Sequence, residues 1–70
     1  MNAAIIAVGS EMLTPTRIDS NSLYLTEKLN ALGVEVVQKL VMGDHRERLE
    51  ASIIFCLEHA EILIISGGLG

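Results

Sequence analysis

The sequence has few of the residues that mark a secreted, membrane-spanning or redox-active protein. Its 70 residues include one cysteine, no tryptophan and two aromatic side chains. Cys56 cannot form an internal disulfide, which is typical of a reducing compartment. No apolar run approaches the roughly 18 residues of a membrane helix. The apolar residues 1–8 also lack the positively charged N-terminal region of a signal peptide. We therefore expect a cytoplasmic protein that has no contact with membranes.

Positive charge is also scarce. Five Lys and Arg residues face nine Asp and Glu residues, the formal net charge is −4, and the cations are scattered singly. Without a basic stripe to neutralise a phosphate backbone, direct binding of nucleic acid is not expected. What the chain does have is apolar residues, at 50% of the total, which is typical of a globular core. No repeat, low-complexity stretch or linker divides it, so residues 1–70 are interpreted as part of one domain.

Three short apolar runs predict β-strands. Residues 3–8 and 62–65 are continuously apolar, as in parallel strands that are covered on both faces. Residues 34–41 are interrupted by polar side chains, which favours a strand nearer the edge of the sheet. We expect this strand outside the first one, and the third strand centrally, on the other side of the first.

Two amphipathic segments predict helices between these strands. In residues 21–32, Leu25, Leu29 and Leu32 recur at helical spacing, and Gly33 follows as an end signal. The second helix is expected after Asp44, which would cap it in combination with Glu47. Its predicted core stripe comprises Leu49, Ile53, Cys56, Leu57 and Ala60, whereas Ile54 and Phe55 lie off it.

Alternating strands and helices predict an α/β fold with right-handed crossovers, namely a three-layer, doubly wound, mainly parallel sheet. The chain contains a β-α-β-α-β portion of such a fold. It stops directly after the third strand, inside the glycine-rich residues 67–70. We therefore expect it to be the first part of a larger domain.

The loops that follow parallel strands emerge at one edge of the sheet, so residues 9–19, 42–44 and 66–70 are expected to converge. Between the first and third strands this edge forms a crevice, a place that favours phosphate or nucleotide ligands. The amides of Gly67, Gly68 and Gly70 could approach an anion closely. An ordinary glycine turn explains the same residues equally well.

The first loop offers oxygen ligands for a hard metal ion, together with one guanidinium that could meet a phosphate. These residues are Ser10, Glu11, Asp19 and Arg17. Asp19, Asn21 and Asp44 equally suit helix starts, where short polar side chains accept hydrogen bonds from free amides. His45 and His59 lack metal-type spacing and are expected to be solvated.

Two common nucleotide-binding motifs are missing. Residues 9–13 read Gly-Ser-Glu-Met-Leu where a GxGxxG fingerprint would follow the first strand, and no GxxxxGK[ST] stretch occurs. An NAD-dependent dehydrogenase or a P-loop NTPase is therefore disfavoured.

An ordered set of motifs resembles the N-terminal domain of the competence/damage-inducible CinA family. The matching blocks are residues 7–13, 19–22, 43–44 and 66–70. This family shares the molybdopterin-binding-like domain of the MogA and MoeA cofactor-assembly proteins. Residues 14–17 depart from the pattern, because many relatives carry a glycine and a shorter turn there, so no role for Arg17 carries over.

The resemblance implies a metal-dependent ADP-ribose pyrophosphatase activity for this domain, and nicotinamide mononucleotide deamidation for a C-terminal domain that these residues do not include. It also implies a divalent metal ion, held by Glu11 or Asp44 together with aspartates beyond residue 70, so that this chain alone would be inactive. No catalytic residue carries over. By motif position, the implied pocket residues are Ser10, Glu11, Asp19, Asn21, Asp44, Gly67, Gly68 and Gly70.

Two other functions stay open. The same domain architecture serves pterin binding and adenylyl transfer in molybdenum-cofactor biosynthesis, and a fold alone does not choose a substrate. The chain could also be a non-catalytic module that forms a homo-oligomer through Ile54 and Phe55. These two side chains could equally pack on the part of the domain that lies beyond residue 70.

Overall fold

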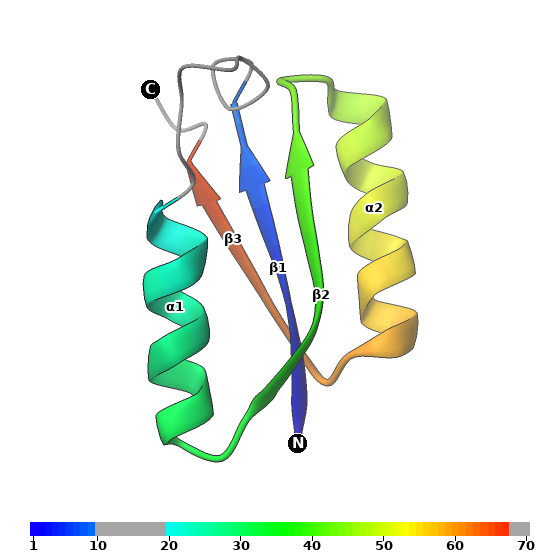
Figure 1. Cartoon of the computed structure of the whole chain (residues 1–70). Helices are drawn as coiled ribbons and strands as arrows, with labels where there is room; N and C mark the ends of the chain where they lie inside the picture. The colour runs from blue at the N-terminus through cyan, green and yellow to red at the C-terminus, as the bar shows by residue number, and fades with distance from the viewer. Residues whose placement is uncertain (10–19, 68–70) are drawn as a thin grey trace.

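The computed structural model describes residues 1–9 and 20–67, and their elements alternate between strand and helix (Figure 1). The predicted order of elements is confirmed. Along the chain they are β1 (Asn2–Val8), α1 (Ser20–Ala31), β2 (Glu35–Met42), α2 (Arg46–His59) and β3 (Ile62–Gly67).

The three strands form one parallel sheet in the order β2-β1-β3. This order confirms that the second strand lies outside the first and that the third lies on its other side. Helices α1 and α2 cover opposite faces of the sheet, which gives the expected three layers (Figure 1). Within the described residues β3 occupies an edge rather than the predicted central position, and β1 is central.

β1 holds most of the core because both of its faces are covered. Ile5 and Ile6 are each 0% exposed. Since side chains alternate along a strand, they face opposite helices. Ala4, Ile6 and Val8 cluster with Cys56 of α2, and burial raises the pKa of the Cys56 thiol, so this core residue is neutral. The cluster is completed by partly buried side chains of α2, β2, β3 and the turn after α2: Leu40, Met42, Leu49, Ile53, Ala60 and Leu63.

Hydrogen bonds at the amino ends of β1 and β3 hold the two strands in register. The backbone amide of Glu61 donates to the Asn2 side-chain oxygen over 2.9 Å, and the Asn2 side-chain amide donates to the His59 carbonyl over 3.4 Å. Pairing then runs without a shift from Ala3 opposite Ile62 to the far end of both strands. The relative height of the strand ends, where the candidate site lies, is thereby fixed.

The helices differ from the sequence-based expectation at a few positions. α1 ends at Ala31, so Leu32 lies beyond it and is 78% exposed, while Gly33 has the expected positive φ of 81°. Leu57 is 57% exposed, so its place in the core stripe of α2 was wrong. It follows Cys56 by one residue, a rotation of about 100° that carries it off the buried face.

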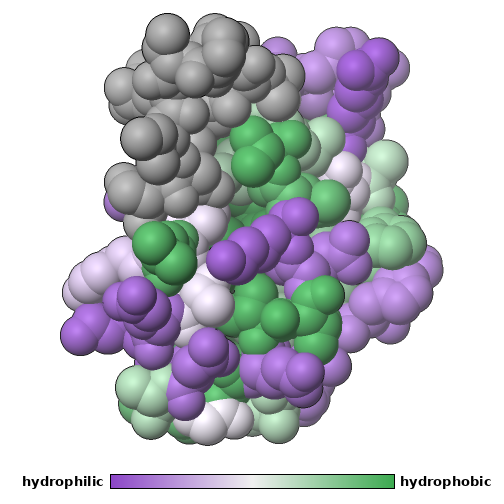
Figure 2. Space-filling view, in the orientation of Figure 1, coloured by the Kyte–Doolittle hydropathy of each residue, from purple (hydrophilic) through white to green (hydrophobic). Residues whose placement is uncertain are grey.

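Apolar side chains also reach the surface, where polar side chains separate them on the side seen in Figure 2. Neither helix in the described part of the chain is long and apolar enough to cross a membrane.

Candidate functional site

The three strands end level with one another and form what we call the carboxyl rim, residues 8–9, 42–44 and 66–67. Val8 is paired both with Met42 of β2 and with Gly67 of β3. The Gly9 amide donates to the Met42 carbonyl over 2.9 Å, which continues the pairing of β1 with β2 one residue beyond β1. As predicted, the chain therefore leaves all three strands at one edge of the sheet.

Gly67 is the last residue of β3, whereas the sequence placed it in the loop beyond. Its φ is 81°, and a Cβ atom at this position would lie 2.5 Å from the Val8 carbonyl oxygen. Such a contact cannot be accommodated without moving the backbone of the central strand. The backbone therefore requires glycine here whether or not an anion binds, which favours the structural interpretation of this one residue.

Asp44 and Asn21 are exposed and lie on different elements. Asp44 follows β2 at the rim, and Asn21 lies in the first turn of α1. Because β1 stands between them, β2, which Asp44 follows, and β3, which ends at Gly67, are roughly 10 Å apart. In residues 1–9 and 20–67, no three His, Cys, Asp or Glu side chains group closely enough to hold a metal ion.

The other predicted pocket residues lie outside the described residues: Ser10, Glu11, Asp19, Gly68 and Gly70. Arg17 of the first loop is outside them as well. The crevice between the first and third loops, and the anion cradle of the glycine loop, therefore stay predictions.

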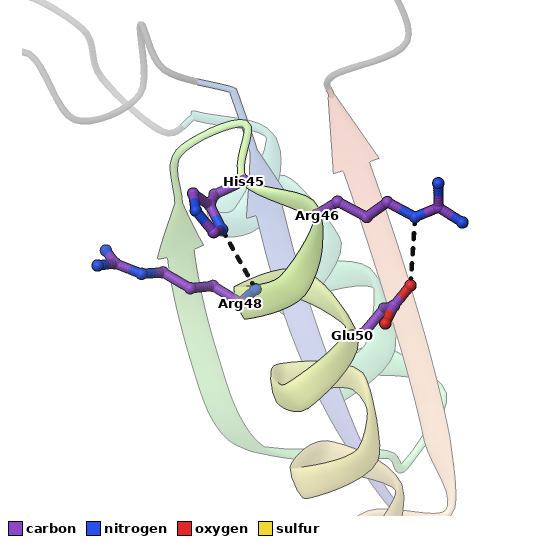
Figure 3. A network of polar contacts seen from close by, with 4 residues as sticks. All are labelled: His45, Arg46, Arg48 and Glu50. Carbon is purple, nitrogen blue, oxygen red and sulfur yellow. Dashed lines mark hydrogen bonds and ion pairs between the residues drawn. The ribbon is translucent and has the colours of Figure 1, made fainter.

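Asp44 does not cap α2, which corrects the sequence-based interpretation. The N-cap residue is His45, and its Nδ1 accepts a hydrogen bond from the Arg48 amide over 3.5 Å (Figure 3). Because the helix begins at Arg46, Asp44 stands one residue before the capping position. Its carboxylate is thereby left at the rim without a capping role. His45 and His59 are both exposed, as expected.

The arginines at the start of α2 were missed by the sequence reasoning, which treated all cations as scattered. Arg46 and Arg48 both lie in the first turn, next to the rim (Figure 3). Arg46 Nε is 3.3 Å from Glu50 Oε1, and both side chains are largely exposed, so this pair contributes little to stability. Their position two and four residues after Asp44 could have shown that they lie close to the end of β2. Glu47 lies between them in the same turn, so the start of α2 places both signs of charge next to the rim.

Comparison with known proteins shows to which family the chain belongs. A family model described as "Probable molybdopterin binding domain" matches residues 4–70. The chain therefore belongs to the molybdopterin-binding domain family.

Within that family the chain is similar to CinA-like proteins along its whole length. It is 60% identical over 70 residues to a CinA-like protein of Solibacter usitatus and 57% identical to one of Acidobacterium capsulatum. A crystal structure of the protein CinA, of unknown function, from Thermoplasma acidophilum matches with a TM-score of 0.93 and 29% identity over 99% of this chain. The chain spans 17% of the length of these two curated relatives and 41% of the crystallised protein.

Proposed function

We propose that the carboxyl rim is part of the nucleotide site of a protein that hydrolyses a nucleoside diphosphate linkage such as that of ADP-ribose. The observation that carries this proposal is the level ending of three parallel strands around β1. The chain crosses from β1 to one side and then to the other, and open α/β sheets bind ligands at such a switch in strand order. For the whole protein, the proposal extends to nicotinamide mononucleotide deamidation by a further domain.

In this proposal, the backbone around Gly67, Gly68 and Gly70 holds phosphate oxygens through its amides. Arg48 in the first turn of α2 is the cation that we propose to attract a diphosphate near the same edge, against the opposing charge of the neighbouring Glu47. Ser10, Asp19 and Asn21 line the same pocket. No described residue is assigned a covalent role, since the chemistry needs positioning and charge neutralisation above all.

Asp44 and Glu11 are the proposed ligands of a divalent metal ion. Asp44 is exposed at the rim and is not used as a helix cap, so its carboxylate is available. A single described carboxylate fits Mg²⁺, which keeps several waters and binds proteins through one or two carboxylates plus substrate phosphates. When bound, such an ion offsets charge on the phosphate oxygens and lowers the pKa of an attacking water.

The proposal is tested by the release of AMP from ADP-ribose, with added Mg²⁺, by a full-length CinA-like protein that carries this chain. Asp44→Ala is expected to lower kcat/KM at least tenfold. The matched control is Glu35→Ala, which removes an exposed carboxylate at the opposite end of β2. Equal activity of both variants would overturn the role of Asp44. Release of AMP by the 70-residue chain alone would contradict our expectation that it is inactive without further residues.

A second candidate, pterin binding or adenylyl transfer, is favoured by the description of the matched family as a molybdopterin-binding domain. Calorimetric titration of the full-length protein with ADP-ribose and with molybdopterin separates the two candidates. Tighter binding of molybdopterin would replace our first choice. Nucleic acid has no place in either proposal.

A further inference from the structure

We draw no further inference here: the strongest candidate, the exposed apolar surface of α2 at Ile54 and Phe55, carries none because nothing among the described residues shows what covers it.

Discussion

At the scale of single residues, two glycines show that the same backbone angle has different consequences in different surroundings. Gly33 and Gly67 both have a φ of 81°. Around Gly33 nothing lies within 4 Å of an added Cβ, because the residue follows α1 in an open turn. At Gly67 the added atom would lie 2.5 Å from the Val8 carbonyl oxygen. Gly33 is therefore needed only because of its backbone angle. Gly67 is needed both because of its angle and because there is no room for a Cβ atom.

This difference predicts the effects of two alanine substitutions. Gly33→Ala is expected to lower the free energy of unfolding by roughly 1 kcal/mol, the cost of a left-handed backbone with a Cβ. Gly67→Ala is expected to cost at least about twice as much, because the end of β1 must also move. Urea unfolding followed by circular dichroism measures both changes. Equal costs would show that the close approach of β3 to β1 is not as described.

At the scale of elements, the start of α2 shows what local sequence patterns can and cannot predict. The spacing of Asp44 and Glu47 fits a capping box, yet the helix begins one residue later and His45 takes the capping position. Histidine is a poor capping residue, and its 3.5 Å hydrogen bond is long. The helix is therefore held by its packing on the sheet more than by its cap.

A better cap should consequently stabilise the protein. His45→Asp is expected to raise the free energy of unfolding by about 0.5–1 kcal/mol, because a carboxylate accepts from the first amides and complements the helix dipole. Asp44→Ala is expected to change it by less than about 0.5 kcal/mol, the usual range for a surface substitution. Thermal unfolding of both variants checks this. A large loss of stability in Asp44→Ala would show that Asp44, and not His45, caps α2.

The strands and the alternating order were predictable because continuous apolar runs such as residues 3–8 leave few alternatives. The ends of the elements, and the contacts that each residue makes with other elements, were less predictable. Leu57 was assigned to the core because helical spacing allows it, but only the position of α2 on the sheet decides which flank is covered. The backbone reason for Gly67 depends on the register of β1 and β3, which no local pattern contains. At the site, the edge that carries Asp44 and Gly67 was predicted from topology, whereas the arginines of α2 were overlooked.

At the scale of the whole molecule, the stability of the described part of the chain depends on one central strand with a helix on each face. A chain of 70 residues has a free energy of unfolding on the order of 5 kcal/mol. Ile5 and Ile6 are fully buried and face opposite layers, so each face of β1 contributes a large part of the core. Neither layer has a second core of its own among the described residues.

Three isoleucine-to-alanine substitutions test this two-sided dependence. Ile5→Ala and Ile6→Ala are each expected to cost about 2–5 kcal/mol, as for buried aliphatic side chains whose removal leaves a cavity. A loss at the upper end of this range equals about the whole stability of the chain, and a variant with such a loss should be unfolded to a large fraction at room temperature. The control Ile65→Ala removes a side chain that is 46% exposed and should cost less than about 1 kcal/mol. Urea unfolding measures all three. If Ile5→Ala costs no more than Ile65→Ala, then α1 does not seal its face of the sheet, and the α2 layer alone holds the strand ends of the carboxyl rim in place.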